Sequence, residues 1–122
     1  MPLFFNILAL GMTALLGWLY LYGIEHDLFW IYPWFDVLLH SIGGFVMGSW
    51  ACAVSSRLSL PLRPALFLVG ATALMGGVAW EVFEYLFALQ GGLLDTVSDL
   101  VLGVAGALGA LVLYALISRL RV

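Results

Sequence analysis

The chain is poor in charge and contains no lysine. Only 9% of its 122 residues are charged, and its four basic residues are all arginines. So few cations give no basic surface that would hold nucleic acid. With 65% hydrophobic residues and a mean hydropathy of +1.15, the chain also has too little polar surface to cover a water-soluble globule. The sequence predicts an integral membrane protein whose main neighbour is the lipid bilayer.

The chain has only one cysteine. The single cysteine, Cys52, excludes an internal disulfide and a multi-cysteine zinc site, and we interpret it as a small packing residue. Strands are not expected, because the apolar runs are long and do not alternate between polar and apolar residues.

Four hydrophobic runs have about the 20 residues needed to cross a bilayer. We place them at residues 3–22, 34–56, 65–89 and 95–118. The first run lacks a basic leading segment and a small-x-small cleavage site, so it is predicted to be a transmembrane helix rather than a signal peptide. Because short connections force neighbouring helices antiparallel, we expect an all-α integral membrane protein, a four-helix antiparallel bundle with residues 1–122 as one transmembrane domain.

The connections carry their own signals. Residues 23–33 are rich in aromatic side chains and resemble an interfacial segment with an aromatic belt. In the next connection, Pro61 and Pro64 are expected to end one helix and start the following one. The Gln-Gly-Gly sequence at 90–92 is expected to close the third helix.

The arginines predict the orientation of the bundle. Arg57 and Arg63 follow the second run, and Arg119 and Arg121 follow the fourth, so all four lie on one side of the membrane. By the positive-inside rule this side and both termini are cytoplasmic, and we expect the protein in the cytoplasmic (inner) membrane of a bacterium. The other side receives every acidic residue and both histidines: Glu25, His26, Asp27, Asp36, His40, Glu81, Glu84, Asp95 and Asp99.

Three of the apolar runs carry a pair of ionisable residues near their outer ends. Each such group costs about 2.5 to 3.5 kcal/mol at the bilayer centre, so these groups normally face a protein interior and mark function. At 1.5 Å per residue the pairs lie at similar depths, within about 12 Å of the outer boundary, and each pair continues into a stripe of small residues suited to helix contacts. We expect convergence of Asp36, His40, Glu81, Glu84, Asp95 and Asp99.

The charge of this set limits what it can do. Its carboxylates cannot all be ionised beside one histidine without protons, a bound cation or basic groups from a partner. Carboxylate oxygens with an imidazole suit manganese, iron, zinc, calcium or magnesium, so the six residues are candidate ligands of a divalent metal ion of open identity. Pairs at these spacings also build dinuclear carboxylate sites in helical bundles, although the usual Glu-x-x-His motif is missing.

Several of these residues have a simpler interpretation. Asp95 can cap the fourth helix, because acids are favoured at helix starts. His40 can be a hydrogen-bonded packing residue, and Glu84 can be solvated at the interface. Glu25, His26 and Asp27 fit a wet loop, from which His26 can still reach over the cluster.

The motifs Asp36-x-x-x-His40, Trp80-Glu81-x-x-Glu84 and Asp95-Thr96-x-x-Asp99 occur here in that order. Together they resemble the VanZ-like membrane proteins and the related YjdF-type family of small bacterial membrane proteins. The VanZ-like pattern usually has lysine at position 37, glutamine at 84 and asparagine at 103, where this chain has valine, glutamate and glycine. The sequence is therefore more similar to the YjdF-type form, and the missing lysine removes a counter-charge from the acids.

Three functions fit these observations. The first is an outward-facing cluster that binds a divalent metal or protons and acts on an envelope or lipid-linked substrate. The alternative is an accessory subunit of a larger membrane complex, or a homo-oligomer, in which a partner neutralises the acids. A cation or proton transporter ranks lower, because the inner halves of the spans hold little polar beyond serine and threonine. Catalytic residues stay unassigned, since no Ser-His-Asp order is apparent.

Overall fold

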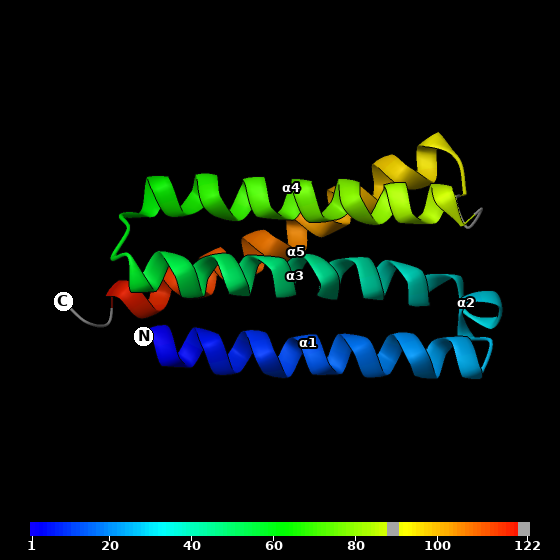
Figure 1. Cartoon of the computed structure of the whole chain (residues 1–122), viewed down its shortest axis with the longest axis horizontal. Coiled ribbons are helices and arrows are strands. Elements are labelled where there is room, and N and C mark those ends of the chain that lie inside the picture. The colour runs from blue at the N-terminus through cyan, green and yellow to red at the C-terminus, as the bar shows by residue number, and fades with distance from the viewer. Residues whose placement is uncertain (88–90, 120–122) are drawn as a thin grey trace.

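The computed structural model describes residues 1–87 and 91–119. Predictions that involve Leu89, Gln90 and Arg121 fall outside this part of the chain. Within it, the helices are α1 (Pro2–Glu25), α2 (Leu28–Ile31), α3 (Pro33–Arg57), α4 (Leu62–Leu86) and α5 (Leu93–Arg119), as Figure 1 shows. Over the same residues, four helices are long and apolar enough to cross a membrane and no strand occurs. The predicted all-α class with four membrane-spanning helices is confirmed.

The helix ends lie within three residues of the predicted spans wherever the structure describes them. Prolines set several of these ends, because a missing backbone N–H is tolerated only in the first turn of a helix. Pro33 starts α3, and α4 begins directly after Pro61. The third long helix ends at Leu86, earlier than the Gln-Gly-Gly sequence expected to close it.

The connection between α1 and α3 contains a short helix. Within the predicted interfacial segment, residues Leu28–Ile31 form the single-turn helix α2. Asp27 precedes it in a left-handed conformation, with φ of 56°. Trp30 on this turn is 88% exposed, as expected for an aromatic side chain at a membrane interface.

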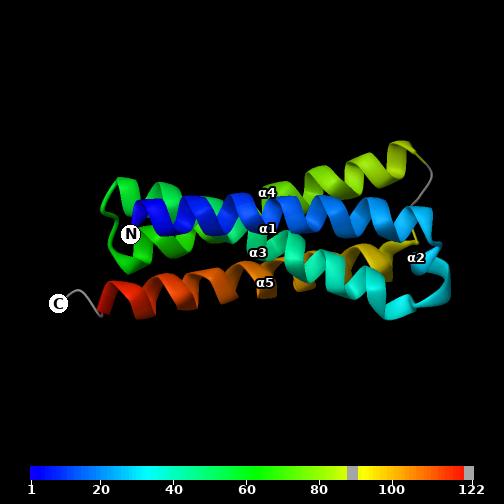
Figure 2. The same cartoon turned by 90° about the horizontal axis from the view of Figure 1, so that it is seen from below.

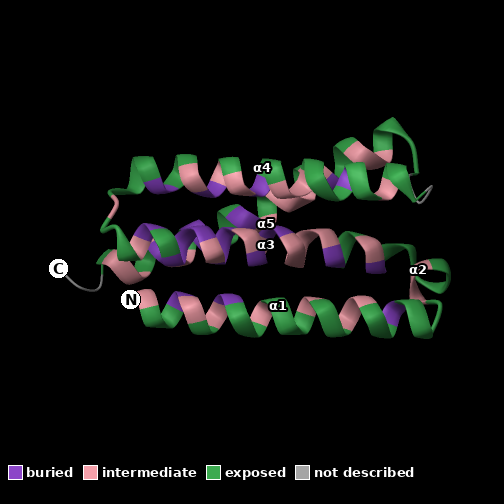
Figure 3. Ribbon diagram, viewed as in Figure 1, coloured by how far each residue is buried: buried purple, intermediate pink, exposed green. Residues whose placement is uncertain are grey.

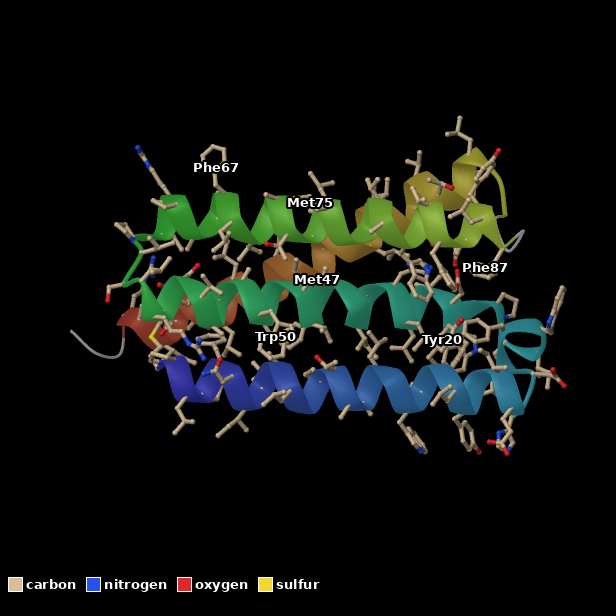
Figure 4. The ribbon with its side chains drawn as sticks, in the orientation of Figure 1. Tyr20, Met47, Trp50, Phe67, Met75 and Phe87 are labelled. Atoms are coloured by element: carbon tan, nitrogen blue, oxygen red, sulfur yellow. The ribbon has the colours of Figure 1, made fainter. Side chains whose placement is uncertain are left out.

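Helix α3 is the centre of the bundle. It packs against α1, α4 and α5, whereas the backbone of α1 approaches only α2 and α3 within the described chain. Figure 1 shows α3 between α1 and α4, and Figure 3 shows its many buried positions. Trp50 points from α3 toward α1 in Figure 4 and donates a hydrogen bond to Thr13 Oγ1 at 3.1 Å.

Helices α3 and α5 cross in backbone contact, and both views in Figures 1 and 2 show the crossing. Gly44 on α3 faces the backbone of Gly103, and Gly106 on α5 faces the backbone of Ser41. A Cβ atom at Gly44 or Gly106 would overlap the partner helix. Small residues allow such close approach in membrane helices. Close to this crossing, His40 of α3 lies beside Asp99 of α5.

The other half of the bundle has an apolar core. Phe5, Cys52, Val69, Ala110 and Tyr114 are buried there, and Cys52 packs without a disulfide. The lipid-facing side of α4 is apolar too: Phe67 and Met75 project away from the bundle in Figure 4 and are 80% and 74% exposed. The arginines that the structure describes, Arg57, Arg63 and Arg119, belong to helix ends at this half.

Candidate metal centre

Asp36 and His40 lie one turn apart at the start of α3. His40 Nε2 is 3.4 Å from Asp36 Oδ1 and 3.2 Å from Asp99 Oδ2, so the imidazole lies between a carboxylate of its own helix and one of α5. The glycine crossing of α3 and α5 makes the second approach possible. The two helices therefore bring an imidazole and a carboxylate, two potential ligands of different chemical type, next to each other.

Asp99 is the most enclosed acid of the cluster. Its side chain is 5% exposed, and Oδ2 has no hydrogen-bond partner within the described chain. The 3.2 Å contact with His40 is short, but its alignment is not that of a hydrogen bond. An unpaired polar atom in a buried position costs about 1 to 3 kcal/mol, and more when it is charged. This oxygen therefore requires a proton or a cation.

Glu81 and Glu84 approach from the last turns of α4. Glu81 is 7% exposed, and its Oε2 accepts a hydrogen bond from Thr96 Oγ1 of α5 at 2.9 Å. Glu84 Oε1 accepts one from Trp80 Nε1, also at 2.9 Å. The indole of Trp80 packs edge-on against the ring of Tyr20 from α1, with ring centroids 5.7 Å apart. Both carboxylates are thus oriented by neighbours.

These residues form two groups. Within each group, the potential ligand atoms all lie within 4.8 Å of one another. One group is Asp36, His40 and Asp99, and the other is Glu81, Glu84 and Asp99. Oxygen ligands lie about 2.0 to 2.6 Å from Mg²⁺ or Ca²⁺, so two ligands of one ion are separated by no more than about 5 Å. Each group is therefore compact enough to hold a divalent cation with small side-chain adjustments.

Asp95 belongs to neither group. It lies in the first turn of α5, where its carboxylate packs closely against Gly91. Acidic residues in the first turn of a helix interact favourably with the helix dipole, so the capping interpretation fits this residue. The turn before it contains Gly92 with φ of 107°, a backbone conformation that residues other than glycine rarely adopt.

Three residues at the end of α1 and just after it also stay apart from the cluster. Glu25, His26 and Asp27 are exposed. The His26 ring stacks on Tyr22 at 4.0 Å, and its Nδ1 lies 3.0 Å from the Tyr22 carbonyl oxygen. The structure therefore places His26 against α1 and not over the acids.

Two side chains orient carboxylates of the centre but were not predicted to do so from the sequence. Thr96 binds Glu81, and Trp80 binds Glu84. The spacing contained a signal for each, because Thr96 lies three residues before Asp99 and Trp80 lies four residues before Glu84. Residues at these separations share a helix face.

A crevice of about 280 Å³ lies between α4 and α5 beside the acids. Val78, Val82, Tyr85 and Leu100 supply most of its wall, and Glu81 and Thr96 supply polar groups. A second depression of about 510 Å³ is at the opposite end of the bundle, near Arg57 and Tyr114, far from the acids along the helices. The crevice between α4 and α5 therefore borders the candidate centre at Glu81.

Comparison with known proteins agrees with this architecture. A family model described as "Predicted membrane protein (DUF2238)" matches residues 2–120, which is nearly the whole chain. No curated protein and no solved structure matches the chain. On the extent of the family match, the chain belongs to the DUF2238 family of predicted membrane proteins.

Proposed function

We propose that this multi-pass membrane protein binds a divalent cation through the cluster around Asp99. The observation that carries the proposal is the buried Asp99 carboxylate. Its Oδ2 lacks a hydrogen-bond partner within the described chain, and the carboxylate lies among potential ligand atoms from α3 and α4. The ligands that we assign are Asp36, His40, Glu81, Glu84 and Asp99. We do not assign Asp95, the sixth candidate from the sequence, as a ligand, because it fits a capping role.

The distribution of charge favours a cation. His40 can supply one positive charge when protonated, whereas the two groups contain four carboxylates. The described arginines belong to the other end of the bundle, so they do not neutralise these acids. A divalent cation reduces this excess of negative charge and also satisfies the oxygen lone pairs directly. By the positive-inside rule we place this end on the outer side of a bacterial cytoplasmic membrane, with both termini inside.

The crevice beside Glu81 supports a lipid-linked substrate. Its apolar wall suits a hydrocarbon or isoprenoid chain from the surrounding bilayer, and its polar groups adjoin the proposed ion. An anionic headgroup such as a phosphate would then be drawn toward the cation, which can polarise a phosphoryl or carbonyl oxygen as a Lewis acid. We therefore propose metal-assisted chemistry on an envelope lipid as the role of the site.

Conduction of ions has less support. The half of the bundle beyond the crossing is filled by the apolar core around Cys52, Ala110 and Tyr114. An ion that left the cluster toward the arginine end would have to cross this core. The arrangement favours binding at one face over passage through a single protomer.

The finer resemblance to VanZ-like and YjdF-type proteins stays a prediction.

Metal analysis of the purified protein tests the proposal. We expect Mn²⁺, Zn²⁺ or another divalent ion to be retained through gel filtration in mild detergent. Glu81→Gln should reduce this content strongly, whereas the matched control Glu25→Gln, which changes an exposed acid, should leave it unchanged. If the protein retains no ion and instead brings a constant partner with basic transmembrane residues, the accessory-subunit alternative replaces the proposal.

Proton competition should weaken the binding at low pH. Metal ligands must be deprotonated, so binding releases protons and the affinity falls as the pH is lowered. Isothermal titration with Mn²⁺ at several pH values in buffers of different ionisation enthalpy measures both effects. An affinity independent of pH between about 5 and 8, with no proton release, would contradict binding by these carboxylates and His40.

Loss of the Thr96 hydroxyl should weaken the metal site while the fold persists. Thr96→Val removes the hydrogen bond to Glu81 Oε2 but keeps the branched shape of the side chain. Loss of such an orienting partner typically lowers metal affinity by about 10- to 100-fold. The matched control is Thr72→Val, which removes a hydroxyl that donates a hydrogen bond to the Leu68 carbonyl of its own helix. Equal affinities in the two variants would show that Thr96 does not orient a ligand.

A further inference from the structure

We propose that the cluster is a dinuclear centre in which Asp99 bridges two divalent cations. This inference rests on the proposed function, since it concerns the number and arrangement of the ions. It follows from the membership of Asp99 in both compact groups. A carboxylate has two oxygens and can place one on each of two ions.

The geometry divides the remaining ligands between the two ions. Asp36 and His40 come from the start of α3, and Glu81 and Glu84 come from the end of α4. Asp99 of α5 reaches both pairs, so it occupies the only position shared by the two groups among the described residues. One ion then has Asp36, His40 and Asp99 as ligands. The other has Glu81, Glu84 and Asp99.

The charges balance for two ions. Asp36, Glu81, Glu84 and Asp99 carry four negative charges when ionised, and two divalent cations carry four positive charges with His40 neutral. A single divalent cation would leave two uncompensated negative charges close together in a membrane-spanning region, which is costly. The second ion therefore removes a penalty that the first leaves in place.

The two positions differ in chemistry and in access. The first has an imidazole nitrogen, and Asp36 is 36% exposed, so water from the outer side can reach it. The second has only carboxylate ligands, and Glu81 also borders the crevice between α4 and α5. Mixed nitrogen and oxygen ligands suit zinc, iron or manganese, whereas carboxylates alone suit magnesium, calcium or manganese. A headgroup that enters from the bilayer would meet the second ion first.

Titration with Mn²⁺ tests the inference, because manganese suits both ligand sets and is detected by electron paramagnetic resonance. We expect two Mn²⁺ per chain in the metal-depleted protein and a spectrum that shows exchange coupling, since bridged ions lie about 3.5 to 4 Å apart. Asp36→Asn and Glu84→Gln should each reduce the stoichiometry to one uncoupled ion. Asp99→Asn should weaken both ions together, and Glu25→Gln should retain two.

The outcomes separate this inference from the proposed function. One Mn²⁺ per chain in the unmodified protein would overturn the dinuclear arrangement and leave the cation site standing. Two ions without coupling would overturn the bridge. No bound Mn²⁺, Zn²⁺ or Mg²⁺ would overturn both proposals. If Asp99→Asn fails to fold, as judged by circular dichroism and gel filtration, the Asp36→Asn and Glu84→Gln stoichiometries still decide between one ion and two.

Discussion

Replacement of Asp99 by asparagine is expected to stabilise the metal-free protein and to abolish its stabilisation by metal. In the metal-free state the Asp99 carboxylate is buried, and its Oδ2 has no hydrogen-bond donor within the described chain. Asparagine has nearly the same size, carries no charge, and has an amide N–H that can be donated to a neighbouring carboxylate. We expect the free energy of unfolding without metal to rise by about 1 to 3 kcal/mol.

The metal-bound state should respond in the opposite direction. A ligand that binds only the folded protein at about 1,000 times its dissociation constant stabilises that protein by about 4 kcal/mol. Asp99→Asn should lose most of this gain, because an amide is a much weaker ligand than a carboxylate. The order of stability of the two proteins would therefore reverse when Mn²⁺ is added.

Thermal unfolding in detergent, with chelator and with added Mn²⁺, measures this reversal. Asp27→Asn is the matched control, because Asp27 is exposed and outside both ligand groups. It should follow the unmodified protein in both conditions. If Asp99→Asn destabilises the metal-free protein as much as the metal-loaded one, Asp99 is a packing residue and not an unsatisfied ligand.

Among glycine-to-alanine substitutions at the helix contacts, Gly44→Ala should cause the largest loss of stability. The added Cβ would overlap the carbonyl of Gly103, and a backbone carbonyl cannot turn aside as a flexible side chain can. Overpacking of this kind typically costs about 1 to 3 kcal/mol, and occasionally more. Separation of α3 from α5 would also move His40 away from Asp99, so metal affinity should fall with stability.

Gly70→Ala provides the matched control. A Cβ at Gly70 meets no atom within 4 Å, and the substitution removes backbone freedom from the unfolded chain. It should leave stability unchanged or raise it by about 0.4 to 1 kcal/mol. Thermal unfolding and Mn²⁺ titration of both variants check this contrast. Unaltered stability and affinity in Gly44→Ala would mean that the α3–α5 contact is looser than the structure indicates.

Hydropathy predicted the fold well because the bilayer restricts the chain to a few solutions. Long apolar runs must be helices, and short connections must make them antiparallel. The central position of α3 was not predictable in this way. Small residues line α3, α4 and α5 alike. Only the three-dimensional structure shows that Gly44 meets the backbone of Gly103.

The candidate site was predictable in part for similar reasons. The i, i+4 spacing of Asp36 and His40 placed them on one helix face, and the structure brings them within 3.4 Å. The membership of Asp99 and the exclusion of Asp95 depend on the rotation of α5 about its axis. That rotation follows from where the helix starts and from how it meets α4, through the Thr96 bond to Glu81, which no single run of sequence reveals.

Anomalous diffraction from crystals grown in lipid with Mn²⁺ would locate the bound ions. We expect two anomalous peaks about 3.5 to 4 Å apart, with Asp99 between them, His40 beside one and Glu81 beside the other. An absence of peaks at saturating Mn²⁺, with Asp99 paired to an arginine or lysine of another chain, would contradict this expectation.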